Sequence, residues 1–169
     1  MPIRAAVPAD VPVILRMIKA LAEYEKEPES AKATEEQMHV ALFAEQPTAY
    51  CELVDVEGDQ VVAFALWFKN FSTWTGTAGI YLEDLFVLPE HRGKGYGKAL
   101  LVHLAQKCIA NGWHRFQWWV LDWNEPSIQF YRALGAEAMD EWTVYRVSGD
   151  ALQRLADSPH AFSEPSAES

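Results

Sequence analysis

A run of alternating glycines and cations at residues 92–97 has the composition of an anion-binding loop. It reads Arg-Gly-Lys-Gly-Tyr-Gly and follows an apolar segment of strand type that is broken by Pro89. Glycine accepts positive φ angles and close approach, so successive backbone amides can converge on one anion. A helical apolar pattern begins directly after the run, and a helix N-terminus also attracts negative charge. The run therefore predicts a phosphate-binding loop at the start of a helix.

Two common phosphate loops do not fit this run. A Walker A loop has Lys-Ser/Thr after its last glycine, whereas Gly97 is followed by Lys98 and Ala99. The dinucleotide fingerprint G-x-G-x-x-G is spaced more widely than the glycines at 93, 95 and 97. A helix start with flexible glycines and no ligand is the remaining plain interpretation.

Two carboxylates lie directly before the loop. Glu83 and Asp84 occupy the strand-like segment there, and a carboxylate can take a proton from a substrate. A later run, Trp-Asn-Glu-Pro-Ser-Ile-Gln-Phe-Tyr at residues 123–131, ends in Tyr131, which as a lone tyrosine on an amphipathic helix is more typical of a core residue. The alternation of a strand predicts that Glu83 and Asp84 point to opposite faces and do not share a role.

Composition narrows the class of partner. The chain has 169 residues, a formal net charge of −10 and 12% aromatic residues. Binding nucleic acid requires clusters of Lys and Arg, so nucleic acid is not expected as the main partner. The acidic balance would suit a cationic substrate, although an acidic surface that only maintains solubility explains it as well.

The two cysteines and the apolar runs bear on the compartment. Cys51 and Cys108 form no CxxC or zinc pattern, and both lie in apolar segments, so we expect buried thiols and no metal site. No signal-peptide pattern or membrane-length apolar stretch is present, so no membrane partner is expected. We therefore expect a cytoplasmic protein.

Periodicity predicts an α/β layered protein. Residues 1–158 are expected to form one domain and residues 159–169, rich in Ser, Glu, Pro and Ala, a disordered C-terminal tail. Strands alternate with helices in the order β-α-α-β-β-β-α-β-α-β, and the helix before residue 112 should connect two parallel strands. The expected strands are residues 3–5, 49–56, 60–69, 80–87, 115–120 and 143–147, with a hairpin turn at 57–59.

Three separated segments together resemble one acetyltransferase branch. The run Tyr-Leu-Glu-Asp-Leu-Phe-Val at 81–87, the glycine loop and the run at 123–131 resemble the spermidine/spermine (diamine) N-acetyltransferase branch of the GNAT superfamily. The resemblance extends from about residue 3 to residue 146. It implies the GNAT fold, with a central mixed, mostly antiparallel twisted sheet of about seven strands flanked by helices. It also implies a parallel crossover around an acetyl-CoA site, and a homodimer.

The resemblance also assigns roles to individual residues. Glu83 would deprotonate the substrate amine directly or through water, and Tyr131 would protonate the departing sulfur. Coenzyme A would contact Leu85, Phe86, Val87, Arg92, Gly93, Lys94, Gly95, Tyr96, Gly97, Lys98, Asn124, Glu125, Pro126, Ser127 and Tyr131. The amine substrate would contact Tyr24, Glu25, Glu83, Asp84, Gln117, Trp118, Trp119 and Asp140.

The expected function is acetyl-CoA-dependent N-acetylation of a primary amine by direct attack in a ternary complex. The expected substrate is a small cation: a diamine, a polyamine or a lysine-like amino acid such as thialysine. The alternatives are acetylation of a protein lysine or N-terminus, and an acyl-CoA-binding module without catalysis. Lys26, Pro28 and a short segment at 136–142 depart from the polyamine enzymes, which leaves the length and charge of the substrate open.

Overall fold

The computed structural model describes residues 3–56 and 60–159. The chain divides into two compact units, Met1–Glu125 and Pro126–Ser169. The hairpin turn expected at 57–59, and all of the expected tail except residue 159, lie outside the described residues. The single-domain expectation for residues 1–158 stays a prediction.

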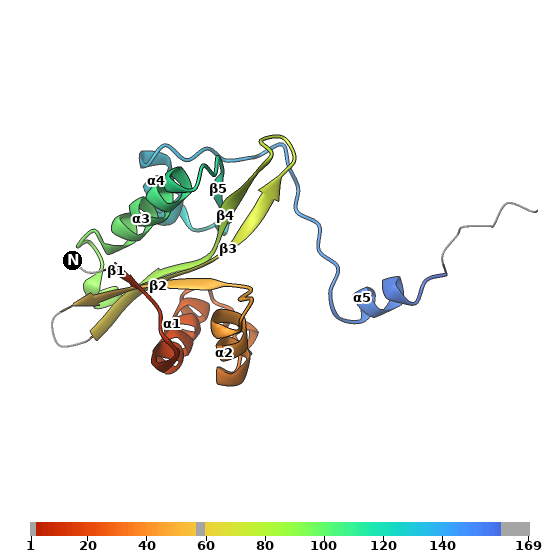
Figure 1. Ribbon diagram of the computed structural model, residues 1–169, viewed down its shortest axis with the longest axis horizontal. Helices are drawn as coiled ribbons and strands as arrows, with labels where there is room; N and C mark the ends of the chain where they lie inside the picture. The colour runs from red at the N-terminus through yellow and green to blue at the C-terminus, as the bar shows by residue number, and fades with distance from the viewer. Residues whose placement is uncertain (1–2, 57–59, 160–169) are drawn as a thin grey trace, which may run out of the picture. The chain divides into compact units, whose positions relative to one another are not determined.

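The first unit is built on a mixed five-stranded sheet with the strand order β1-β2-β3-β4-β5 (Figure 1). The first three pairings are antiparallel, and β4 pairs with β5 in parallel. The sheet is therefore mixed and mostly antiparallel, as expected. Its strands are β1 (Ile3–Ala5), β2 (Tyr50–Val56), β3 (Gln60–Ser72), β4 (Thr77–Val87) and β5 (Phe116–Trp118).

The expectation of about seven strands is wrong for the described part of the chain, which contains five. The strand expected at residues 143–147 is irregular backbone, and its Val144, Tyr145 and Val147 side chains are exposed. Apolar and β-branched residues favour a strand only where a neighbouring strand offers a ladder, and none pairs with this segment among the described residues. The connection between the strands expected at residues 60–69 and 80–87 is also shorter, because β3 and β4 extend into it and leave a tight turn at residues 73–76.

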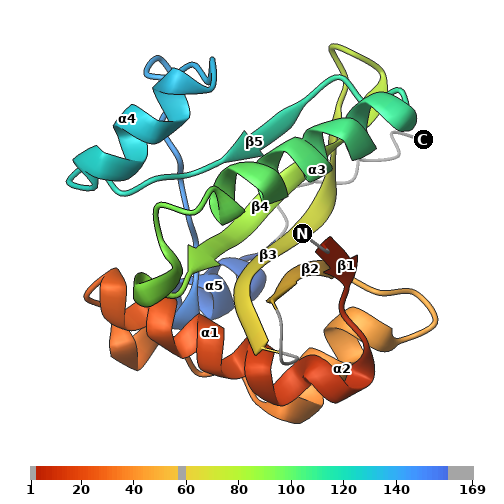
Figure 2. The ribbon, with the colours of Figure 1, turned by 90° about the vertical axis from the view of Figure 1, so that its left-hand side faces the viewer.

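Helices cover both faces of this sheet. Figures 1 and 2 show α1 (Val11–Tyr24) and α2 (Glu35–Phe43) on one face and α3 (Tyr96–Ala110) on the other. Thr34 and Gln37 form a capping box at the start of α2, because they exchange side chain–backbone hydrogen bonds of 3.2 and 3.0 Å. The second unit contains most of α4 (Glu125–Ala133), which begins at the last residue of the first unit, and α5 (Gly149–Ala156).

The core of the first unit fixes the position of α1 against the sheet. Val11 and Ile14 of α1 pack in one cluster with Leu53, Phe64 and Phe86 of the strands, and four of these five side chains are fully buried. Burying an apolar side chain of this size stabilises the fold by about 1.5–3 kcal/mol. In the last turn of α1, Leu21 belongs to the same cluster and Tyr24 packs against it, and Arg92 lies over the rings of both Tyr24 and Phe86, so this turn lies beside the C-terminal half of β4.

Candidate functional site

A β-bulge at Glu83 changes the direction of the side chains in the middle of β4. Tyr81 pairs with Phe68, whereas Asp84 pairs with Leu66, so β4 has one more residue than β3 between these pairs. An extra residue shifts the alternation of the strand by one position. Asp84 consequently shares a face with Tyr81 and Phe86, the face that is covered by α1.

The bulge corrects one expectation from the sequence. Glu83 and Asp84 do not separate onto opposite faces, because the simple alternation used to predict this is interrupted between them. Glu83 is exposed and Asp84 is partly buried. A hint was present in the sequence: apolar residues alternate at Ile80 and Leu82, and resume out of phase at Leu85 and Val87.

Three carboxyl groups act on one another at this place. Burial, followed by the charges of Glu83 and Glu25, raises the pKa of Asp84 to about 7. Burial and the charge of Glu83 also raise the pKa of Glu25, which follows the last residue of α1. We call Glu25, Glu83 and Asp84 the acidic cluster. Such a cluster lowers its electrostatic cost when a cation binds, so it favours a substrate that carries an ammonium group.

Aromatic rings and cations surround the end of α1 beside the acidic cluster. The Tyr24 hydroxyl donates a hydrogen bond of 3.1 Å to Oδ1 of Asn124, which is buried. The ring of Tyr24 lies 6.2 Å from the ring of Trp123. The guanidinium carbon of Arg92 lies 4.9 Å from the Tyr24 ring centre, and Nζ of Lys26 lies 4.5 Å from the Trp123 ring centre. Both distances are in the range of cation–π attraction.

These contacts bring together predicted residues that are distant in the sequence. Tyr24, Arg92 and Asn124, expected from three separate segments, lie in one group. Trp123 and Lys26 also belong to this group and were not predicted as site residues, although Lys26 was noted as a departure from the polyamine enzymes. Spacing alone could not find them, because they belong to two irregular segments that only the folded chain places side by side.

The glycine loop has the backbone geometry that was predicted for it at two of its three glycines. Gly93 and Gly95 have φ values of 76° and 85°, and Gly95 is the N-cap of α3. Among the described residues, no atom lies within 4 Å of where a Cβ on either residue would be. Gly97 lies in the first turn of α3 without a positive φ. The loop thus leaves open space in front of helix-terminal amides, as an anion site requires.

Four further predicted cofactor contacts lie in or beside the same loop. Arg92 Nε donates to the Val87 carbonyl oxygen over 3.1 Å, which ties the loop to the end of β4. Lys94 in the loop and Lys98 in the first turn of α3 are exposed, and Tyr96 is the first residue of that helix. Three cations therefore lie at or next to one helix N-terminus, where they add to its attraction for a phosphate.

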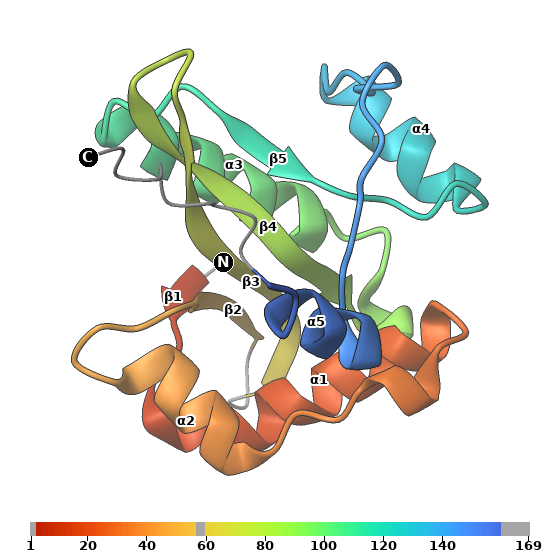
Figure 3. The same cartoon turned by 90° about the vertical axis from the view of Figure 1, so that its right-hand side faces the viewer.

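The C-terminal half of β4 has a free edge on the side of β5. The two strands pair through Ile80–Leu82 of β4 and Phe116–Trp118 of β5. Figure 3 shows the strands side by side at one end of β4 and separating along it. Leu85 and Val87 direct their backbone groups to that edge, because Leu88 donates to Val62 of β3 and backbone direction alternates along a strand, so the groups of Phe86 face β3. The Val87 carbonyl accepts from Arg92, which leaves the Leu85 groups and the Val87 N–H available in the described structure to an extended ligand, as in strand addition.

The residues expected on β5 lie near the point where β4 and β5 separate. Gln117 accepts a hydrogen bond of 3.0 Å from Asn70 Nδ2, so its side-chain amide is fixed by β3. Trp118 contacts the ring of Phe116 edge-on at 4.9 Å. Trp119 is exposed and contacts the ring of Tyr81 at 5.7 Å. Trp119 is therefore linked to β4, the strand that carries Glu83 and Asp84 of the acidic cluster.

The remaining predicted residues lie on or after α4. Glu125, Pro126, Ser127 and Tyr131 belong to this helix, and the Tyr131 ring lies 5.5 Å from that of Phe130. Asp140 is exposed in a turn of the second unit. Their roles stay predictions.

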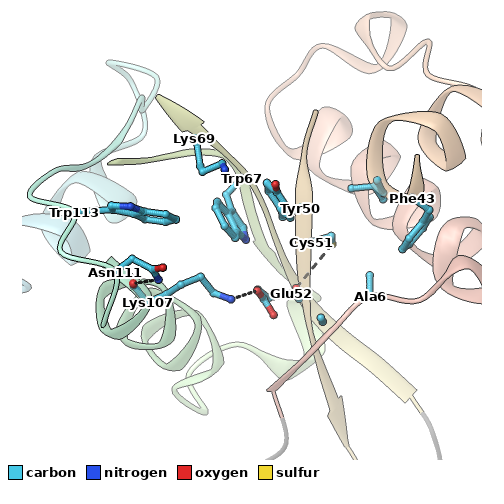
Figure 4. A pocket seen from close by; sticks show the side chains of 12 residues that line it. Ala6, Phe43, Tyr50, Cys51, Glu52, Trp67, Lys69, Lys107, Asn111 and Trp113 are labelled. Carbon is cyan, nitrogen blue, oxygen red and sulfur yellow. Dashed lines mark hydrogen bonds and ion pairs between the residues drawn. The ribbon is translucent and has the colours of Figure 1, made fainter. Parts of the chain in front are cut away.

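A cavity of about 420 Å³ lies elsewhere in the first unit, at the start of β2. Figure 4 shows Lys107 reaching from α3 to the buried Glu52, 3.1 Å away, below the rings of Tyr50 and Trp67. None of the residues that line it was predicted as a site residue, and none belongs to the acidic cluster. The carboxylate of Glu52 is already paired there, so this cavity does not resemble the predicted site.

Neither cysteine has the properties of a nucleophile. Burial, followed by the charge of Glu52, raises the pKa of the Cys51 thiol. Burial also raises the pKa of the Cys108 thiol. Attack requires the thiolate, so a raised pKa opposes covalent catalysis by either residue. Among the described residues, no cluster of metal-binding side chains and no helix suited to crossing a membrane was found.

Comparison with known proteins agrees with this geometry. The sequence pattern of the acetyltransferase (GNAT) family matches residues 15–136. The chain belongs to the GNAT family of acetyltransferases. A thialysine N-epsilon-acetyltransferase from Sus scrofa is 37% identical over 164 residues, which cover 91% of this chain and 96% of the relative. A spermidine/spermine N(1)-acetyltransferase-like protein from Homo sapiens is 31% identical and covers 91% of this chain and 23% of its own length.

Solved structures agree with the fold of this GNAT protein. An integron cassette protein from the mobile metagenome of V. cholerae superposes with a TM-score of 0.78 at 28% identity, covering 93% of this chain and 98% of that one. The expected fold and branch are thus confirmed, and the protein is an N-acetyltransferase. The two curated relatives carry names for different amine substrates, so the family alone leaves the substrate open.

Proposed function

We propose that this GNAT protein transfers the acetyl group of acetyl-CoA to the primary amine of a small cationic substrate. The observation that carries the proposal is the acidic cluster beside the free edge of β4. The cluster offers negative charge to an ammonium group, and the edge offers backbone groups to an extended thioester arm. A relative that acts on thialysine supports the choice of a small amine over a protein.

Glu83 is the proposed acceptor of the amine proton. An alkylammonium group has a pKa of about 10.4, so roughly one molecule in a thousand is neutral at pH 7 and ready to attack. Glu83 is exposed at the bulge, where it can take the proton directly or through water. Asp84 is partly buried beside it, and its raised pKa makes it a second acceptor of the amine proton near neutral pH.

The glycine loop and β4 are proposed to hold acetyl-CoA. The cosubstrate supplies the activated acetyl group, and open space at Gly93 and Gly95 fits its pyrophosphate. An amide on the free edge of β4, near Leu85, can donate to the thioester oxygen as negative charge develops there. Tyr131 is proposed to donate its phenolic proton to the departing sulfur. Both thiols have raised pKa values, which supports direct attack by the amine in a ternary complex.

One assay tests the proposal. Purified protein is mixed with acetyl-CoA and a panel of primary amines, and thiol release is followed. Glu83→Gln should lower kcat by roughly 10²–10⁴-fold, because it removes the proton acceptor and keeps the shape. The matched control is Glu90→Gln, which changes an exposed acid outside the cluster. Measurable coenzyme A binding without thiol release from any amine would refute the proposal.

Tyr131→Phe provides an independent check on the leaving-group step. Loss of the phenolic proton should lower kcat by about 10²-fold while the affinity for coenzyme A, measured by calorimetry, changes little. An unchanged kcat would show that another group protonates the sulfur.

A further inference from the structure

Lys26 occupies a backbone position that normally favours glycine. It follows Glu25 at the end of α1, and its φ is 64°, the one positive φ of a non-glycine residue among the described residues. The left-handed conformation just after a helix is usually taken by Gly, because a Cβ clashes with the backbone there. A lysine is strained at this position, so its side chain is a candidate for a function that a glycine could not serve.

The side chain of Lys26 is held on an aromatic ring. Its Nζ lies 4.5 Å from the centre of the Trp123 ring, and Trp123 packs against Tyr24 at 6.2 Å. The guanidinium carbon of Arg92, the second cation of the group, lies 4.9 Å from the centre of the Tyr24 ring. The Lys26 residue is exposed, so an ammonium positioned by the ring remains accessible to a ligand. We call Lys26 and Arg92, with the two rings between them, the cationic pair.

The cationic pair adjoins the acidic cluster through a single peptide bond. Glu25 belongs to the acidic cluster, and the next residue is Lys26, with its Cα about 3.8 Å away. Negative and positive charge are therefore presented side by side at the end of α1. A matching ligand carries an ammonium group at one end of its chain and a carboxylate at the other. A diamine of the same length would place an ammonium beside Lys26 without the carboxylate that, in an α-amino acid, is attached to the same carbon as the α-ammonium and offsets its repulsion from Lys26.

On the basis of the proposed function, we propose that Lys26 binds the α-carboxylate of an amino-acid substrate while the acidic cluster binds the amine at the end of its side chain. The substrate class is then an α-amino acid with a terminal primary amine, rather than a diamine or polyamine. Lys26 is a specificity-determining residue in this proposal, and it takes no part in the proton transfers.

Two pairs of substrates that differ by the α-carboxylate alone test this. Lysine is compared with cadaverine, and ornithine with putrescine, by steady-state thiol release. The wild type should have the higher kcat/KM for the amino acid of each pair. Lys26→Gly should lower kcat/KM for lysine by about 10-fold, the loss of one ion pair, and raise it for cadaverine. Lys26→Glu should reverse the preference, and Lys26→Arg should retain it.

Controls separate this effect from folding and from total charge. Lys26→Gly suits the left-handed backbone, so its melting temperature should not fall below that of the wild type. Lys32→Glu, at an exposed lysine, makes the same change in net charge as Lys26→Glu and should leave the preference for lysine in place. If Lys26→Gly and Lys26→Glu acetylate both members of each pair in the wild-type ratio, this inference is overturned and the proposed function stands. If the wild type acetylates no amine, the proposed function fails and this inference fails with it.

Discussion

Asp84 is a carboxyl group that the folded chain keeps protonated at mildly acidic pH. Burial is the main cause of its pKa of about 7, with smaller contributions from Glu83 and Glu25. In the unfolded chain an Asp ionises near pH 3.9. Between these two values the folded state holds a proton that the unfolded state has released. The contribution of this group to stability is therefore complete below about pH 4 and is lost as the pH rises to about 7.

Asp84→Asn should remove this pH dependence, because the amide has nearly the same shape and does not ionise. The free energy of unfolding of the variant, minus that of the wild type, should rise by at least about 1 kcal/mol between pH 4.5 and 7.5. Urea unfolding at several pH values measures the difference. Glu90→Gln, at an exposed carboxyl, should give a nearly flat difference. A flat difference for Asp84→Asn as well would mean that Asp84 ionises normally.

At the scale of elements, the backbone between β4 and the first turn of α3 requires glycine at Gly95 and accepts another residue at Gly97. Gly95 has a φ of 85° as the N-cap of α3, a conformation that costs another residue about 1–2 kcal/mol. Gly97 lies in the first turn without a positive φ, and a Cβ there would lie 3.6 Å from Cγ2 of Val87, an ordinary contact.

The two glycines should therefore respond in opposite directions to the same substitution. Gly95→Ala should lower the free energy of unfolding by about 1–2 kcal/mol and weaken coenzyme A binding, since the amides that face the anion turn away. Gly97→Ala should raise the free energy of unfolding by about 0.5–1 kcal/mol, because alanine favours the helix. Urea unfolding and calorimetric titration with coenzyme A measure both effects. Equal destabilisation by the two substitutions would show that backbone conformation does not distinguish them.

Short-range sequence patterns predicted most of the helices and strands. They missed the bulge in β4 and predicted a strand at residues 143–147 that does not form. The capping box at Thr34 and the glycine loop before α3 were predictable, because each depends on neighbours within a few residues. The bulge at Glu83 was missed because it is a property of the pairing between β3 and β4. The strand expected at residues 143–147 was wrong because β-propensity does not supply a partner strand.

At the scale of the whole molecule, charge is the property that composition determines directly. The formal net charge of −10 is spread over 24 acidic and 14 basic residues. An excess of this size attracts cations over a distance set by the salt concentration, about 10 Å at 0.1 M. The electrostatic potential around the protein therefore favours the approach of an ammonium group to the acidic cluster. The basic glycine loop is a local exception that suits an anionic cosubstrate.

This field should make capture of the amine depend on ionic strength in proportion to the substrate's charge. Raising NaCl from about 0.02 to 0.5 M should lower kcat/KM for a substrate with two positive charges about twice as steeply, on a logarithmic scale, as for one with a single net positive charge. Putrescine and lysine provide this comparison at saturating acetyl-CoA. Potassium acetate replaces NaCl as the control for specific chloride effects. Equal slopes for the two substrates would mean that the amine is captured by local contacts alone, without a contribution from the acidic surface as a whole.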